Sequence, residues 1–146
     1  AEMLEADFDI AAEIWSATSF NELTREAQDC ERWNNLHPDK KAKVSYVEKC
    51  LTGHDGPVIA ATDYMQNYAE QIRAYVPSYF VALGTDGFGR SDSRANLRTH
   101  FEVNAGYVVV ASLYELANRG EVEKSVVSDA IKRFNINADK LNPLYA

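Results

Sequence analysis

Residues 57–83 read PVIAATDYMQNYAEQIRAYVPSYFVAL, and this stretch decides the fold class. It opens with a continuous apolar run, Pro57–Thr62, of the length typical of a strand buried on both faces. Apolar side chains then recur at helical spacing from Met65 to Val76, and Pro77 ends that helix. A second buried strand is expected over Tyr79–Leu83. Strands that alternate with helices in this way predict an α/β fold with a mostly parallel sheet.

The rest of the chain adds further elements to this unit. Ala1–Ala6 has the pattern of the closing turns of a helix, and the alternating Ala12–Thr18 segment predicts a strand. A capping box at Ser19–Glu22 opens the next helix. The expected helices span residues 20–33, 45–51, 97–101, 104–120 and 122–134.

These elements together predict a three-layer α/β/α sandwich with a mostly parallel sheet, built as a single domain over residues 1–146. The chain opens on a helix that should follow a strand. We therefore expect a first strand to be missing and the chain to be a fragment of a longer polypeptide.

Composition excludes several classes of protein. The 15 Lys and Arg against 22 Asp and Glu give a net charge of -7, which argues against a nucleic-acid-binding protein. No apolar run is long enough for a membrane span, and no signal-peptide pattern opens the chain. Cys30 and Cys50 are not spaced as a metal-binding or redox pair. They predict reduced thiols in a cytosolic protein.

The glycine-rich loop Gly84–Arg94 is the candidate functional site. It follows a buried strand, where ligands of open α/β sheets tend to bind. Its glycine spacing reverses the dinucleotide fingerprint, and Asp92 would repel a phosphate at the start of the next helix. Arg90 and Arg94 could offset that charge or bind a carboxylate. An interface loop and direct contact with a small ligand both remain open for the residues Asp86, Gly87, Phe88, Gly89, Arg90, Ser91, Asp92, Ser93 and Arg94.

No complete catalytic or metal-binding constellation is visible in the sequence. The three histidines, His37, His54 and His100, are scattered, and Asp86 and Asp92 lack a third ligand at calcium-loop spacing. There is no nucleophile elbow of the Gly-x-Ser-x-Gly type. We therefore assign no catalytic, cofactor-binding or metal-ligating residue.

Several longer motifs resemble one family, the carboxy-terminal domain of the homodimeric bacterial pyruvate dehydrogenase decarboxylating component. The resemblance covers nearly the whole chain, is most specific over Gly84–Arg94, and thins between Asp39 and Asp55. The motifs that carry it are residues 15–23, 29–34, 36–38, 61–65, 75–77, 83–94, 100–103, 107–111 and 134–143.

The resemblance implies a transketolase-like third domain of a thiamine-diphosphate enzyme. The full enzyme would decarboxylate pyruvate and pass the acetyl unit to a lipoyl group on the dihydrolipoyl acetyltransferase core. In that family the first domain holds the diphosphate and magnesium through a Gly-Asp-Gly signature with a later Asn pair. This chain has Gly84-Thr-Asp-Gly87 instead, and its Asn34-Asn35 pair comes before it. The fragment is therefore expected to bind no cofactor and to be inactive alone.

The implied role is to support the dimer in a bacterial cytoplasmic enzyme. Its implied partners are the remaining domains of the same polypeptide, the second subunit and the acyltransferase core, with no nucleic acid and no membrane. In an interface loop, Gly87 and Gly89 would have positive φ, and Asp92 or a flanking serine would cap the next helix. Arg90 and Arg94 would then reach carboxylates elsewhere in the enzyme. A transketolase C-terminal domain and a stand-alone module for a small anion are the alternatives.

Overall fold

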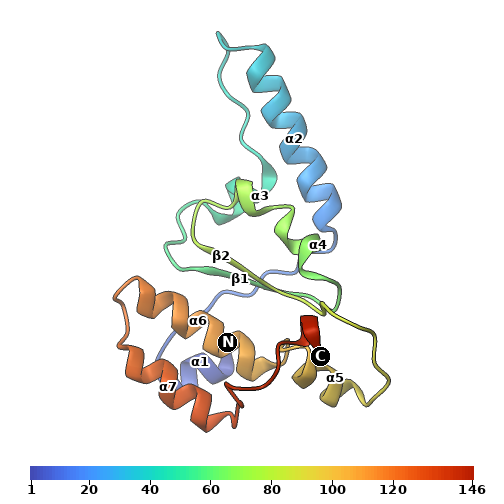
Figure 1. The fold of residues 1–146 in the computed structure, drawn as a ribbon. Helices are drawn as coiled ribbons and strands as arrows, with labels where there is room; N and C mark the ends of the chain where they lie inside the picture. Colours follow the sequence, from blue (N-terminus) through green and yellow to red (C-terminus); the bar gives the residue numbers. More distant parts are fainter.

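A computed structural model describes residues 1–146 and contains seven α-helices, two strands and two 3₁₀-helices (Figure 1). In chain order these are α1 (Glu2–Phe8), α2 (Phe20–Leu36), α3 (Tyr46–Leu51), β1 (Val58–Ala61), α4 (Gln66–Glu70), η1 (Arg73–Tyr75), β2 (Phe80–Leu83), α5 (Arg94–His100), α6 (Ala105–Asn118), α7 (Lys124–Arg133) and η2 (Pro143–Tyr145). None of the helices has the length and apolar character needed to span a membrane.

The two strands form a parallel pair, with Val58 opposite Phe80 and Ala61 opposite Leu83. Both strands lie where the apolar runs predicted them. Helices α2, α3 and α4 lie on one side of this sheet, and α1, α6 and α7 lie on the other (Figure 1). The α/β fold with a parallel sheet between two helical layers is confirmed, although the sheet has only two strands.

Each side of the sheet has its own hydrophobic core. On one side Phe80 and Ala82 of β2 pack with Val47 of α3, Ala69 of α4 and Ile72, which lies between α4 and η1. The other core joins α1, α6 and α7 through Leu4, Val109, Leu113, Val127 and Ala130. Helix α6 also packs against β1, so the lower layer is fixed to the sheet.

Helix α2 projects from the body as an arm (Figure 1). Ser19 caps its first turn by accepting a hydrogen bond from the Glu22 amide, as the capping box predicts. The returning segment is tied to the arm because the Asn34 side chain bonds both the amide and the carbonyl of Lys43. The Trp33 ring stacks on His37 at 4.4 Å. These contacts extend the helix to Leu36, three residues beyond its expected end.

The prediction of a strand over Ala12–Thr18 was wrong. This segment is extended but makes no ladder hydrogen bonds, and Ile14 and Trp15 are 81% and 55% exposed. Strand-like sequence forms a strand only where a partner edge is within reach, and here β1 pairs with β2 alone.

The expected helix over Met65–Val76 is broken into α4 and η1. Arg73, the first residue of η1, links this second part to its neighbours. Its guanidinium pairs with Glu70 and donates a hydrogen bond of 2.7 Å to the Phe80 carbonyl. This contact joins the end of the crossover to the start of β2.

Candidate functional site

The first half of the glycine-rich loop, Gly84–Phe88, is bound to the start of α4. The Thr85 amide donates to the Tyr64 carbonyl at 2.9 Å, and the Thr85 hydroxyl donates to the Asp63 carbonyl at 2.9 Å. The carboxylate of Asp86 accepts a hydrogen bond of 2.9 Å from the Gln66 amide. Because Met65 offers no side-chain cap to α4, Asp86 caps that helix from the loop. Asp86 therefore has a structural role.

Two glycines allow this loop to lie so close to its neighbours. A Cβ atom on Gly84 would lie 2.7 Å from the Tyr64 carbonyl oxygen, and one on Gly87 would lie 2.9 Å from the Pro143 carbonyl carbon. Gly87 also has a φ of 117°, which confirms the expectation for this residue. The same expectation for Gly89 was wrong, because its φ is not positive and its surroundings are open.

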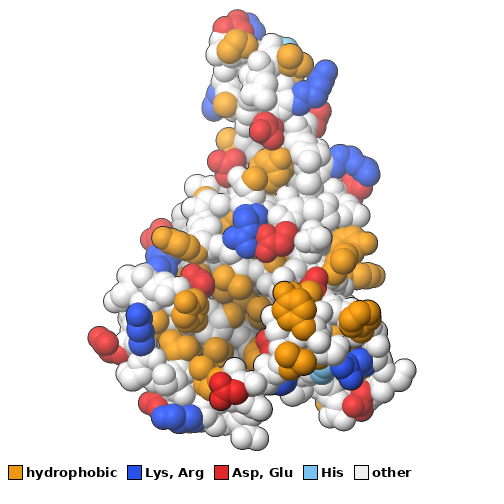
Figure 2. All heavy atoms as spheres, viewed as in Figure 1, with side chains coloured by type: hydrophobic (Ala, Val, Ile, Leu, Met, Phe, Trp, Pro, Cys, Tyr) orange, Lys and Arg blue, Asp and Glu red, His pale blue; other side chains and the backbone are white.

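Exposed apolar side chains surround this part of the loop and form what we term the apolar surface. Tyr64 and Tyr68 lie together, with ring centroids 5.3 Å apart. The contact of Gly87 with Pro143 places the C-terminal turn on the other side of the loop. Figure 2 shows hydrophobic side chains gathered beside α4 and over this turn. The members of the apolar surface are Tyr64, Met65, Tyr68, Phe88, Leu144 and Tyr145, which are 40–76% exposed.

The second half of the loop leads into α5. The Ser93 hydroxyl accepts from the Asn96 amide at 3.3 Å, so a serine caps α5, as expected. The Asp92 carboxylate accepts from the Asn96 side chain and from the Ser93 amide, and these bonds hold its pKa below the ordinary value. Arg94 lies 3.5 Å from the Asp63 carboxylate, whereas Arg90 forms no ion pair within the chain.

A cavity of about 310 Å³ lies between the loop and α5. The Nε2 atom of His100 is buried and has no hydrogen-bond partner. Burial lowers the pKa of His100, and the nearby charges of Arg90 and Lys140 lower it further. The cavity is therefore lined by His100 and by Arg90, whose guanidinium forms no ion pair within the chain. Its lining residues are Arg90, Ser91, Asp92, Asn96, Leu97 and His100.

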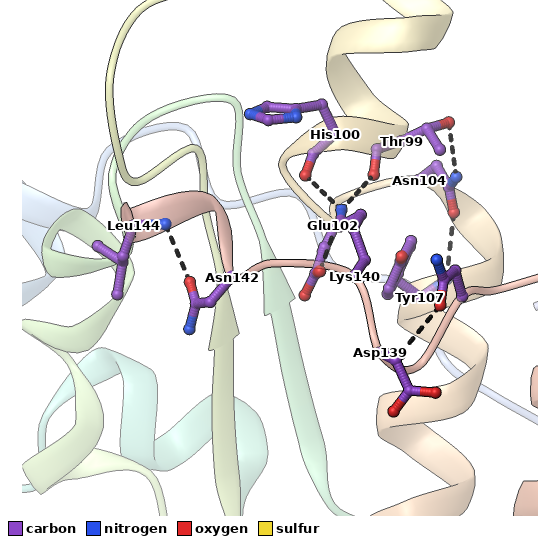
Figure 3. A network of polar contacts seen from close by, with 10 residues as sticks. Thr99, His100, Glu102, Asn104, Tyr107, Asp139, Lys140, Asn142 and Leu144 are labelled. Carbon is purple, nitrogen blue, oxygen red and sulfur yellow. Dashed lines mark hydrogen bonds and ion pairs between the residues drawn. The ribbon is translucent and has the colours of Figure 1, made fainter. Parts of the chain in front are cut away.

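Lys140 fixes α5 against the C-terminal segment (Figure 3). Its ammonium group donates to the carbonyls of His100 at 2.7 Å and Thr99 at 3.3 Å, and pairs with Glu102 at 3.1 Å. It also lies 5.6 Å from the centre of the Tyr107 ring. Sequence reasoning missed this residue, because a lysine that caps a helix 40 positions earlier leaves no local pattern.

The remaining candidate residues do not converge. His37 lies on the arm, and His54 contacts Glu13 and the Trp15 ring, so the three histidines are separate in space. No group of three or more His, Cys, Asp or Glu side chains lies close enough to hold a metal ion. The Cys30 thiol is buried and donates to Glu26, and burial is the main cause of its raised pKa. Both cysteines are free thiols.

The sequence of the chain matches a known protein family. The family described as transketolase-like TK C-terminal domain matches residues 1–104, which include both strands and the whole glycine-rich loop. The chain belongs to this transketolase-like C-terminal domain family. Helices α6 and α7 follow the part of the chain that the family description covers.

The transketolase-like domain is similar over its whole length to larger proteins. It is 57% identical to the pyruvate dehydrogenase E1 component of Escherichia coli K12. The alignment has 147 residues and covers 100% of this chain. The proteins of the same name from Pseudomonas aeruginosa and Cupriavidus necator are 57% and 46% identical, each over 99% of the chain. The domain spans 16% of the length of each of these relatives.

Proposed function

We propose that the chain is the C-terminal domain of a bacterial pyruvate dehydrogenase decarboxylating component, with a structural role in the assembled enzyme. The 57% identity over the full length of the chain carries this proposal. The whole enzyme would use thiamine diphosphate and magnesium to decarboxylate pyruvate, and would transfer the acetyl unit to lipoyl groups of a dihydrolipoyl acetyltransferase core. Its location would be the bacterial cytoplasm.

The residues of this chain do not fit the cofactor of that enzyme. The Asp86 carboxylate in the Gly84–Gly87 turn accepts a hydrogen bond from the Gln66 amide, and it belongs to no group of three or more metal-ligating side chains. A cradle for magnesium and a diphosphate needs several free oxygen ligands. We therefore place no cofactor contact and no chemical step on this domain.

The exposed area of the chain supports a role in assembly. The solvent-accessible surface is 9764 Å², whereas a compact monomer of 16.4 kDa exposes about 7,500 Å². Part of this excess comes from the projecting helix α2 (Figure 1), and contacts in an assembled enzyme could cover such surface. The apolar surface around the loop is a part of this area where contiguous apolar side chains face water. We propose that it packs against the remaining parts of the assembled enzyme, including the second subunit of the dimer.

The test uses the whole enzyme that contains this chain. Phe88→Ala and Tyr145→Ala, combined in one variant, remove two side chains that are 74% and 76% exposed in the isolated chain. If both are buried on assembly, their loss weakens the assembled dimer by roughly 2–4 kcal/mol, or about 30- to 1,000-fold. Dimer dissociation is measured by sedimentation, and pyruvate decarboxylation is measured with an artificial electron acceptor.

A matched control is Tyr114→Ala, because Tyr114 is 55% exposed but lies on α6, outside the apolar surface. This control should leave assembly and activity unchanged. The melting temperature of the isolated chain should change little in either variant, because these side chains already face water there. Full assembly and activity in the double variant would refute the proposed packing.

A further inference from the structure

We propose that the cavity between the loop and α5 binds a small anion, a phosphate or carboxylate group, between Arg90 and His100. This goes beyond the structural role proposed above, because it assigns a ligand to the chain itself. The cavity volume of about 310 Å³ exceeds that of one such group, so the ligand class is a small phosphorylated or carboxylated molecule.

Arg90 supplies the positive charge. It is exposed, lines the cavity, and has no carboxylate partner within the chain, whereas Arg94 and Arg98 both lie next to Asp63. A guanidinium offers two parallel donors that match a carboxylate or a phosphate. Arg90 is therefore the arginine of this region with its full hydrogen-bonding capacity available to a ligand.

His100 supplies a ring nitrogen, Nε2, that forms no hydrogen bond within the chain. Its ring packs edge-on against Phe101 with centroids 4.8 Å apart, and its backbone carbonyl is held by Lys140 (Figure 3). These contacts fix the ring and leave the buried Nε2 atom without a partner. A buried nitrogen without a hydrogen bond is unfavourable, and a ligand oxygen would supply the missing partner.

Asp92 also lines the cavity, and a free carboxylate there would repel an anion. Its Oδ1 atom accepts from the Ser93 amide and from the Asn96 side chain, so the charge is compensated by two donors at the start of α5. The ligand's anionic group would lie on the opposite side, near Arg90 and His100. Ser91, which also lines the cavity, offers a hydroxyl that can donate to the ligand.

This arrangement makes anion binding depend on the protonation of His100. The charged groups that act on the ring are Arg90, Lys140 and Glu102, with Asp92 across the cavity. An anion beside Nε2 favours the imidazolium form, so binding should raise the pKa of His100 and should tighten as the pH falls.

The first experiment follows the three histidines of the chain by NMR during pH titration, with inorganic phosphate, with acetate, and with chloride at equal ionic strength. We expect phosphate or acetate to raise the pKa of His100 and not those of His37 and His54, which serve as internal controls. Arg90→Gln should abolish the shift and weaken binding at least tenfold, whereas Arg94→Gln should preserve both. Equal shifts at all three histidines, or a shift that survives Arg90→Gln, would overturn the proposal.

A second experiment works in the isolated chain and in the whole enzyme. Phenylglyoxal modifies free arginines, and peptide mass spectrometry reports each site separately. Phosphate should slow the modification of Arg90 several-fold and leave that of Arg94 unchanged. Equal rates at Arg90 with and without phosphate would show that no anion binds there.

Discussion

Replacing Gly87 with alanine should destabilise the contact between the loop and the C-terminal turn. Two costs add at this position. A φ of 117° is strained for any residue with a Cβ atom, by about 1–3 kcal/mol. The new Cβ would also lie 2.9 Å from the Pro143 carbonyl carbon and closer still to its oxygen, so η2 must move away from the loop.

We expect Gly87→Ala to lower the free energy of unfolding by roughly 2–4 kcal/mol. For a chain of this length 1 kcal/mol corresponds to about 3 °C, so the melting temperature should fall by roughly 6–12 °C. Thermal unfolding followed by circular dichroism gives this value. Trypsin cleavage after Lys140, which is tied to α5 in the native chain, should accelerate as the C-terminal segment loosens.

Gly89→Ala is the matched control two residues away. Its φ is not positive and no atom lies within 4 Å of the added Cβ, so its melting temperature should stay within about 1 °C of the native value. The reasoning fails if Gly87→Ala melts with the native chain, or if the two variants lose equal stability.

Four further outcomes are expected. Lys140→Met should lower the free energy of unfolding, measured with urea, by about 1.5–3 kcal/mol, because two carbonyls and Glu102 lose a charged partner. The control Lys132→Met, on the surface, should lower it by less than about 0.5 kcal/mol. Burial lowers the pKa of His100 in the folded chain, so the unfolded chain binds the proton more readily. The free energy of unfolding should therefore fall as the pH drops below 6.5, and His100→Gln should flatten that fall. Arg94→Ala should change the melting temperature of the isolated chain by less than about 3 °C, since its ion pair with Asp63 is exposed. A polypeptide extended upstream by one strand should melt at a higher temperature than the 146-residue chain.

Local pattern was sufficient for most of the secondary structure. Apolar runs located β1 and β2, and the Ser19 and Ser93 hydroxyls cap α2 and α5 as their sequence predicts. These features depend on residues within four positions of one another. The long-range contacts were not predictable in this way, because the sequence contains no sign that Lys140 meets α5 or that Pro143 meets Gly87.

The candidate site was predicted as one loop, but the structure divides it into two. Gly84–Phe88 is fixed by Asp86 and Gly87 to α4 and the C-terminal turn, and it lies beside the apolar surface. The second half, from Arg90 onward, faces a cavity whose other wall is α5. The two interpretations, an interface and a ligand loop, therefore concern different halves of the loop and both stay predictions. His100 is the residue of the proposed anion site that its position in the sequence could not indicate.

The failed strand prediction at Ala12–Thr18 has a specific physical explanation. The amides of Val58 and Thr62 donate to the carbonyls of Tyr79 and Leu83. Because alternate residues of a parallel strand bond to opposite sides, Ile59 and Ala61 direct their backbone groups to the outer edge of β1. The outer edge of β2 is partly covered, since Arg73 donates to the Phe80 carbonyl. If the strand that the sequence predicts before Ala1 pairs along the outer edge of β1, it offers its own free edge to residues 12–18. In the extended polypeptide the amides of Ile59, Ala61 and Ile14 should therefore be protected from hydrogen exchange, while in the 146-residue chain they should exchange freely. Equal exchange in both polypeptides would show that the alternating pattern at residues 12–18 does not encode a strand.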